Sequence, residues 1–320
     1  MKKNIIIVAA ICVSVISAVI LARLAADRFL AEENDSAVLP PGPVLEAPKT
    51  EPSAHEEIKD MLSKGEKAMA VKRLQEVADS EKGSRQAYES FLMLAATYKN
   101  DGNFTKAKEY YIAITNEYSE YCNYSQIQEK LNELNIAILF SKIPTKNSEI
   151  YSVVPGDSLT KIAKRYSTTV ELIKRANGLK TDTIMPGQKF KVQKIPFSIV
   201  ADKSQSVLTL ILQDEVVKTY AVSTGKNNST PTGIFQIKDK LVDPVWYSPD
   251  AVVASGSPDN ILGTRWMGLT TPKPGYGIHG TTMPESIGYQ ATEGCVRMRN
   301  DDVEELYAIV PVGTEVTIID

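Results

Sequence analysis

The hydrophobic pattern of this 320-residue chain changes its period at Pro196, and no other feature limits the possible folds as strongly. Before Pro196, apolar residues mostly recur at the three- and four-residue spacing of amphipathic helices. After it, short β-rich runs follow one another, and residues 207–212 are largely apolar on both faces, as in a strand buried inside a sheet. Because domains average about 150 residues, a 320-residue chain whose pattern changes in this way is expected to be multidomain.

The N-terminal segment has the composition of a membrane anchor. An uncharged, mostly apolar run extends from Ile5 to Ala22, with two lysines before it and Arg23 after it. Its 18 residues reach the length of a membrane-spanning helix and exceed the core of most signal peptides. We expect residues 1–30 to form a cytoplasmic tip and a transmembrane anchor, with a cleaved signal peptide as the alternative. Residues 31–53 contain five prolines and are expected to form a linker.

Residues 54–142 have a helical pattern that repeats after 37 residues. The repeated positions include a glycine at a turn and an alanine where helices approach closely. They are Met61, Gly65, Ala70, Leu74 and Val77, which correspond to Tyr98, Gly102, Ala107, Tyr111 and Ile114. The pattern resembles a short tetratricopeptide-like array, which implies a platform for a protein partner. A plain helical bundle acting as a spacer is the alternative.

Residues 149–194 predict a small strand-helix-helix-strand module. A strand-like run is broken at Pro155, and apolar residues then recur at helical spacing from Leu159 to Tyr166. Thr168 and Glu171 are spaced as a capping box for a second helix, which Gly178 ends. A closing strand follows at residues 189–192.

The module resembles a lysin motif (LysM) through "PGDSL", "IAKRY", "ANGL" and "PGQKFKV". The resemblance implies a shallow groove that binds the N-acetylglucosamine-containing glycan strands of peptidoglycan. Candidate glycan contacts are Gly156, Asp157, Ser158, Thr160, Ile184 and Pro186. Several of these residue types are also what a turn requires for its backbone geometry. Because a cytoplasmic LysM module would have no cell wall to bind, we expect the folded part to be exported.

Residues 197–320 predict a mostly-β domain, sandwich-like or barrel-like, with one helix on one side. Three β-rich runs are separated by "DKSQS" and "QDE", and a last strand is expected at residues 316–319. The helix is predicted from an apolar stripe that includes Val303 and Leu306, with Asp301 and Glu304 as its capping box.

One short stretch of this domain, "GYGIHGTTMPESIGYQATEGCVRM", carries the chemistry. It holds one of the two histidines, His279, and one of the three cysteines, Cys295. A thiol attacks a carbonyl as thiolate, so it needs a base or a local field that lowers its pKa. Backbone N–H groups near Gly294 and Cys295 are candidates for an oxyanion hole, and Arg297 for stabilising negative charge. Spacing alone also fits a buried, inert cysteine.

The domain resembles a YkuD-type L,D-transpeptidase catalytic domain, because "STPTGIFQI", "LGTRWMGL", "GIHGT", "PESIG" and "GCVRM" match in content and order. The resemblance implies that Cys295 is the nucleophile and His279 the general base, oriented by the carbonyl of Gly280. Gly294 and Arg297 match the other positions around the nucleophile.

The implied reaction is acyl transfer through a cysteinyl thioester, which forms 3→3 cross-links between peptidoglycan stem tetrapeptides. The resemblance implies no metal and no organic cofactor. Two alternatives stay open: an L,D-carboxypeptidase, in which water is the acceptor, and a non-catalytic peptidoglycan-binding scaffold. The implied location is the cell envelope, anchored in the cytoplasmic membrane with the catalytic part extracytoplasmic (periplasmic). The 36 basic and 39 acidic side chains give no basic field that would predict nucleic-acid binding.

The residue two positions before the nucleophile departs from the family pattern. Family members often have a basic residue or histidine before Gly-Cys, whereas this chain has Glu293, whose carboxylate would raise the pKa of a nearby thiol. In an extended segment, Arg297 would share a face with Glu293 and could offset it. Further candidates for substrate contact are Trp246, Trp266 and Tyr276, although aromatic residues in small β domains are more often part of the core.

Overall fold

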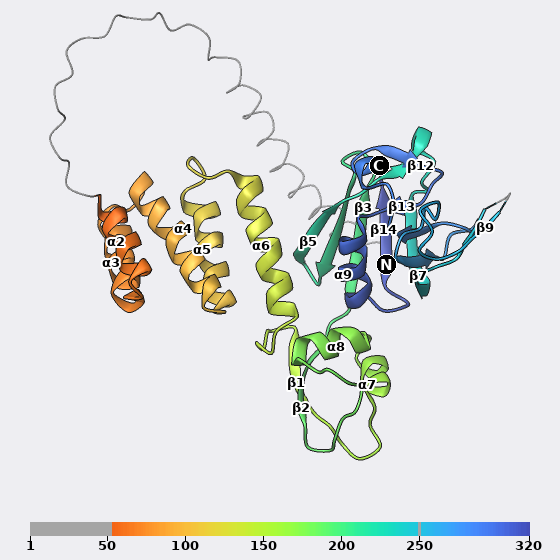
Figure 1. Ribbon diagram of the computed structural model, residues 1–320, viewed down its shortest axis with the longest axis horizontal. Coiled ribbons are helices and arrows are strands. Elements are labelled where there is room, and N and C mark those ends of the chain that lie inside the picture. The colour runs from red at the N-terminus through yellow and green to blue at the C-terminus, as the bar shows by residue number, and fades with distance from the viewer. Residues whose placement is uncertain (1–52, 249–250) are drawn as a thin grey trace, which may run out of the picture. The chain divides into compact units, whose positions relative to one another are not determined.

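The computed structural model describes residues 53–248 and 251–320 and divides into two compact units, residues 1–134 and 135–320 (Figure 1). The predicted anchor, residues 1–30, and nearly all of the predicted linker lie outside the described residues. Among the residues that are described, no helix is long and apolar enough to cross a membrane.

The first unit consists of consecutive helices that pack against their neighbours. They are α2 (Ala54–Ser63), α3 (Lys67–Ser80), α4 (Arg85–Asn100), α5 (Phe104–Glu117) and the first part of α6 (Tyr124–Leu139). The predicted repeat has a structural counterpart, because Gly65 and Gly102 make the turns of two helix pairs with φ of 79° and 73°. Ala70 and Ala107 are fully buried. The helical segment is thus confirmed, and its tetratricopeptide-like character stays a prediction.

Residues 148–193 form the predicted strand-helix-helix-strand module. Its elements are β1 (Ser148–Ser152), α7 (Leu159–Arg165), α8 (Val170–Asn177) and β2 (Lys189–Gln193), with β1 antiparallel to β2. Gly178 ends α8 in the left-handed conformation, as expected. The predicted capping residue was wrong by one position: Thr169 Oγ1 accepts the hydrogen bond from Leu172 N, whereas Thr168 Oγ1 is buried and has no partner among the described residues.

The domain is mostly β, as predicted, and is built on one eight-stranded mixed sheet (Figure 1). In spatial order the strands are β13 (Val296–Arg297), β11 (Gly277–His279), β10 (Arg265–Leu269), β7 (Gly233–Val242), β14 (Glu315–Ile319), β3 (Phe197–Asp202), β4 (Val207–Leu212) and β5 (Glu215–Ala221). Two-stranded ribbons pair β6 (Thr224–Gly225) with β12 (Gln290–Thr292), and β8 (Trp246–Tyr247) with β9 (Val252–Val253). Short 3₁₀ turns occupy η1 (Lys226–Asn228) and η2 (Pro284–Ser286).

Helix α9 (Asn300–Ile309) packs its apolar stripe, including Val303 and Leu306, into the core of this sheet. The predicted Asp301–Glu304 capping box is absent, because Arg299 is the N-cap and makes no side-chain cap bond. The helix instead begins at Asn300, whose Oδ1 accepts hydrogen bonds from Thr264 N and Thr281 N. A side chain at the start of α9 is therefore used to hold two loops.

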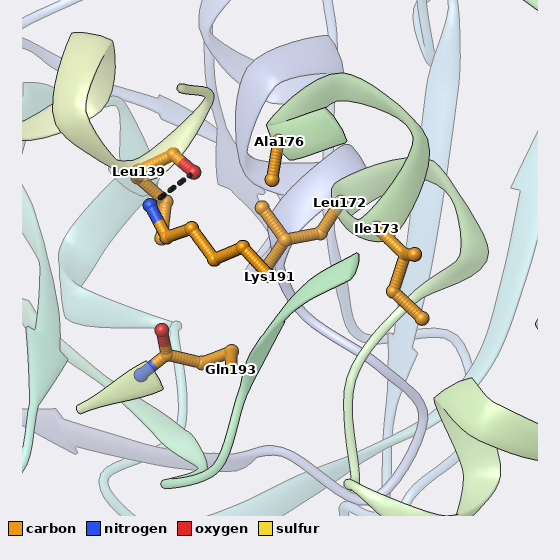
Figure 2. A pocket seen from close by; sticks show the side chains of 6 residues that line it. All are labelled: Leu139, Leu172, Ile173, Ala176, Lys191 and Gln193. Atoms are coloured by element: carbon orange, nitrogen blue, oxygen red, sulfur yellow. Dashed lines mark hydrogen bonds between the residues drawn. The ribbon is translucent and has the colours of Figure 1, made fainter. Parts of the chain in front are cut away.

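A buried lysine joins the small module to the end of α6 within the second unit (Figure 2). Lys191 Nζ donates to the carbonyl oxygens of Ile138 at 2.7 Å and Ser141 at 2.9 Å, and more weakly to that of Leu139. These carbonyls belong to the last turn of α6 and to the residues just after it, where no further helical turn follows to donate to them. Lys191 also lines a small pocket with Leu139, Leu172, Ile173, Ala176 and Gln193. Burial lowers the pKa of Lys191 to about 8.

The lowered pKa predicts a stability that increases with pH. Between pH 8 and 10.5 the unfolded chain holds the Lys191 proton and the folded chain has released it, so the unfolding free energy rises across this window. We expect Lys191→Met to remove on the order of 2–3 kcal/mol of that rise, measured by urea unfolding at several pH values. Lys189→Met, at an exposed position on the same strand, should keep the wild-type slope; equal slopes in all three proteins would contradict the prediction.

Candidate active site

Strand pairing brings the cysteine and the histidine to the same face of the sheet. Strands β11 and β13 run parallel, with Ile278 opposite Val296 and His279 opposite Arg297. Because side chains alternate along a strand, Cys295 shares a face with Arg297 and therefore with His279. In the same register Cys295 lies opposite Gly277, two residues before Arg297. Its Cα is therefore displaced from that of His279 by about 7 Å along the strand direction. The chain between His279 and Cys295, which are 16 positions apart, thus turns back and brings both side chains to the same face.

His279 is buried and held in one tautomer. Its Nδ1 lies 2.6 Å from the carbonyl oxygen of Gly280, and only a protonated Nδ1 can donate to that oxygen. Its ring stacks on Trp266 at 6.0 Å between centroids. The pKa of His279 is lowered to about 4, chiefly by burial, with the positive charge of Arg297 acting in the same direction and the Gly280 bond opposing both. The imidazole is therefore neutral at pH 7, with Nε2 carrying the lone pair.

Cys295 is a half-buried free thiol. Its Sγ donates a hydrogen bond to the Gly275 carbonyl oxygen at 3.4 Å, and within the described residues no hydrogen bond joins it to His279. Burial raises the pKa of the Cys295 thiol, while a hydrogen bond from the Gly277 backbone and the charge of Arg297 act in the opposite direction. Both members of the pair are therefore uncharged at rest, and the thiol needs a base before it can attack.

A turn at Gly294 presents the thiol. Gly294 has φ of 136°, and a Cβ there would lie 2.4 Å from Cε1 of Tyr276, so a larger residue does not fit. Thr292 Oγ1 closes the turn by donating to Cys295 O at 2.7 Å and accepting from Gly294 N at 3.1 Å. The Gly294 N–H is thus occupied, which differs from the expectation that it forms part of an oxyanion hole. The Cys295 N–H is the candidate that this turn leaves.

Arg297 is a buried cation beside the thiol. Its Nη1 donates to Ser286 Oγ at 3.0 Å, and its buried Nε has no partner among the described residues. Burial lowers the pKa of Arg297, although its guanidinium group remains charged at neutral pH. An unpaired donor in this position is costly unless an anion or a substrate oxygen satisfies it.

Glu293 points away from the thiol. Its side chain is 92% exposed and pairs with Lys226 Nζ at 3.4 Å, not with Arg297 as considered from the sequence. The left-handed φ of Gly294 breaks the extended geometry on which the Arg297 pairing depended. An exposed pair of this kind contributes little to stability, and its field is screened by solvent.

The three aromatic candidates have different surroundings. Tyr276 covers Gly294, next to the nucleophile. Trp266 lies against His279, and its Nε1 donates to Asp239 Oδ1 at 3.0 Å, so it supports the base from behind. Trp246 lies in the β8–β9 ribbon opposite Val253, and no contact described for it involves Cys295 or His279.

Most candidate glycan contacts also have structural roles. Asp157 Oδ2 accepts hydrogen bonds from Val154 N and Tyr151 OH, and these bonds hold the pKa of Asp157 below its usual value. Ser158 is the N-cap of α7. Gly156 has φ of 86°, and Ile184 packs on the core of the module. Thr160 and Pro186 are exposed and without such a role. The two predicted groove loops do lie side by side, since Gly187 N donates to Val153 O at 2.8 Å.

Two residues that hold the site were not recognised from the sequence as functional. Thr292 closes the nucleophile turn, and Asn300 reaches the loops of Thr264 and Thr281 because Gly280 and Gly263 leave space for its Oδ1. The Thr-x-Gly-Cys spacing was a signal for the first. The second depends on a close approach between distant segments, for which the sequence has no local signal. Among the described residues, no cluster of three or more His, Cys, Asp or Glu could hold a metal.

Comparisons with known proteins agree with both sequence resemblances. The family model for the L,D-transpeptidase catalytic domain YkuD matches residues 196–318, and that for the LysM domain matches residues 151–193. YkuD of Bacillus licheniformis is 37% identical over 177 residues, which cover 53% of this chain and 98% of that protein. YqjB of Bacillus subtilis is 40% identical over 126 residues, covering 38% of this chain and 70% of that protein.

Among solved structures, an L,D-transpeptidase from Mycobacterium smegmatis matches with a TM-score of 0.33 and 22% identity. The match covers 42% of this chain and 64% of that chain, just under two thirds of its length. The assignment of the two domains rests on the family models and the Bacillus relatives, which confirm the predicted catalytic-domain and LysM resemblances.

The surroundings of His279 predict an imidazole that stays neutral in weak acid. Its proton NMR titration should have a midpoint near pH 4, and a midpoint between pH 6 and 7 would contradict the lowered pKa. Because the unfolded chain binds this proton first on acidification, the unfolding free energy should fall between pH 6.5 and 4, by on the order of 3 kcal/mol. His279→Gln should lose that fall, and His55→Gln, which removes the other histidine, assigns the signal.

The exposure of Glu293 predicts that it has little effect on the thiol. We expect Glu293→Gln to leave the pKa of Cys295 unchanged or slightly lower, measured from the pH dependence of iodoacetamide labelling of the Cys295 peptide. Arg297→Gln is the contrasting variant and should raise that pKa, because Arg297 favours the thiolate. A clear rise in Glu293→Gln would refute the expectation.

Proposed function

The chain belongs to the YkuD family of L,D-transpeptidases, and on that premise we propose that it forms 3→3 cross-links in peptidoglycan through a thioester on Cys295. The observation that carries the proposal is the neutral His279, whose Nδ1 is bonded to Gly280 O and whose Nε2 is available on the face that holds the thiol. A neutral imidazole beside an un-ionised thiol is the arrangement that general-base activation requires.

The first half-reaction forms the thioester. His279 Nε2 accepts the Cys295 proton as Sγ attacks the carbonyl carbon between the third residue of a stem tetrapeptide, commonly meso-diaminopimelate, and the terminal D-alanine. The Cys295 N–H donates to the oxyanion that develops, and the charge of Arg297 stabilises it. When the tetrahedral intermediate collapses, the C–N bond breaks and His279 returns its proton to the amine of the departing D-alanine.

The second half-reaction transfers the acyl group to an amine. The neutral amine of a neighbouring stem peptide attacks the thioester carbonyl, and His279 accepts the proton that the amine loses. The C–S bond breaks, and the thiolate is reprotonated by His279, which restores the resting pair. The same steps with water as the acceptor would give L,D-carboxypeptidase activity. Neither half-reaction requires a metal ion or an organic cofactor.

The LysM domain supplies a second attachment to the substrate. We assign the groove between its two adjacent loops to N-acetylglucosamine-containing glycan strands, with Thr160 and Pro186 as its exposed candidates. Binding the glycan and the stem peptide with one chain raises the local concentration of stem peptides at Cys295 without new contacts in the active site. This assignment places the catalytic part in the cell envelope, outside the cytoplasmic membrane, with residues 1–30 as the proposed anchor. The helices of residues 54–142 then act as a spacer or as a platform for a protein partner.

A carbapenem tests the nucleophile directly. We expect a covalent adduct on the Cys295 peptide in the wild-type protein, none in Cys295→Ser, and acylation slower by about 10²- to 10⁴-fold in His279→Gln. Muropeptides from tetrapeptide-rich sacculi then identify the acceptor: new 3→3 dimers support transpeptidation, whereas tripeptides alone indicate carboxypeptidation. A wild-type protein that forms neither adduct nor product would leave a non-catalytic, wall-binding role.

A further inference from the structure

The nucleophile turn rests on a second loop, residues 225–230, which connects β6 to β7. A Cβ on Gly225 would lie 2.9 Å from the Cα of Gly294, so the two backbones are nearly in contact. A Cβ on Gly294 would lie 3.4 Å from the carbonyl oxygen of Ser229 in the same loop. The position of the 225–230 loop therefore limits where the peptide between Gly294 and Cys295 can lie, and this peptide carries the N–H proposed for the oxyanion.

The 225–230 loop has two consecutive residues in the left-handed backbone conformation. Asn227 and Asn228 both have positive φ, at 51° and 60°, where side chains with a Cβ cost on the order of 1 kcal/mol or more each. Such a conformation persists when surrounding contacts determine it. Inside the loop, Gly225 N donates to Thr230 Oγ1 at 2.7 Å. Ser229 N also donates to Lys226 O at 3.1 Å within the loop, and contacts from outside the loop add to these two bonds.

A lysine and an aspartate supply those contacts. Lys203 is only 4% exposed, and its Nζ donates to Thr230 O at 3.0 Å and pairs with Asp320 Oδ1 at 2.7 Å. The same Asp320 oxygen accepts a hydrogen bond from Asn228 Nδ2 at 2.8 Å. Hydrogen bonds from Lys203 and Asn228 lower the pKa of Asp320, so its carboxylate is ionised at neutral pH. Asn228 and Thr230, in the C-terminal half of the loop, are thus both bound to one ion pair.

The sheet itself places this ion pair. Strands β3 and β14 are parallel, and their last paired residues are Asp202 and Ile319. Lys203 and Asp320 are the next residues on each strand, and Lys203 N also donates to Ile319 O at 3.0 Å. Asn228 links this end of β14 to β12, because its Nδ2 donates to Asp320 Oδ1 and its backbone N donates to Gln290 Oε1 at 3.4 Å. The end of the central sheet is therefore linked to the loop beneath the nucleophile.

We propose that Lys203 and Asp320 are positioning residues that hold the 225–230 loop against Gly294 and thereby set the Cys295 N–H in place for the oxyanion. The inference rests on the proposed acyl-transfer function and adds to it two residues that are remote from the reacting atoms. This ion pair is a poor source of stability, because Lys203 is buried whereas the Asp320 side chain is largely exposed to solvent, and a packed apolar pair is often as stable. Its directed bonds to Thr230 and to Asn228 are what an apolar pair would lack.

Two reactions of the same thiol separate positioning from a structural effect. Acylation by a carbapenem develops an oxyanion, whereas alkylation by iodoacetamide does not. We expect Lys203→Met and Asp320→Ala to slow acylation of the full-length protein by about 10- to 100-fold, with alkylation within twofold of the wild type. The matched control is Lys240→Met, since Lys240 Nζ also donates to two carbonyl oxygens, those of Tyr307 and Val310, at the far end of α9. It should leave both rates unchanged.

The results separate the positioning role of Lys203 and Asp320 from the proposed acyl-transfer function. Acylation at the wild-type rate in Asp320→Ala, whose side chain is 67% exposed and tolerates removal, overturns the positioning role. An equal loss of acylation and alkylation, or the same loss in Lys240→Met, also overturns it, because the effect is then general. If Lys203→Met does not fold, Asp320→Ala alone decides. No acylation of the wild-type protein overturns the proposed function, and this inference with it.

Discussion

The parallel register between β11 and β13 is the constraint on which the candidate site depends. It sets His279 opposite Arg297 and therefore places Cys295 on the same face, next to Gly277. A shift of one residue would turn the thiol into the core and expose Val296, which is 1% exposed. Burial of Ile278 and Val296 on the opposite face therefore holds the reacting groups in position as well as stabilising the domain.

Burial also decides the charge state of the pair. The pKa of His279 is lowered and that of Cys295 is raised, so the site is at rest with a neutral base and a neutral thiol. Arg297 is the nearby fixed charge, and it favours the thiolate and disfavours the imidazolium. In the proposed reaction, charge would then develop as the thiol attacks, in a place where Arg297 can stabilise it. The Glu293 carboxylate, which is exposed and paired with Lys226, stands outside this arrangement.

Much of the domain organisation could be predicted because local patterns determine it. The helix pairs with turns at Gly65 and Gly102, the strand-helix-helix-strand module ended by Gly178, and the three strands from Phe197 to Ala221 all follow from periodicity and turn residues. The errors were also local. Thr169 caps α8 in place of Thr168, and α9 begins at Asn300 without an Asp301 cap. Neighbouring polar residues have similar propensities to start a helix, so tertiary contacts decide which one does.

The sequence by itself determined which groups are available for chemistry: one histidine and one cysteine in a glycine-rich stretch, within motifs that identify a YkuD-type domain and a LysM module. Only the tertiary structure decided how these groups are arranged. It formed one mixed sheet, paired Glu293 with Lys226, and brought Lys203, Asp320 and Thr230 together from three distant segments. The physical reason is that residue type and spacing encode local conformation, whereas strand order and contacts between distant loops arise from packing the whole core at once.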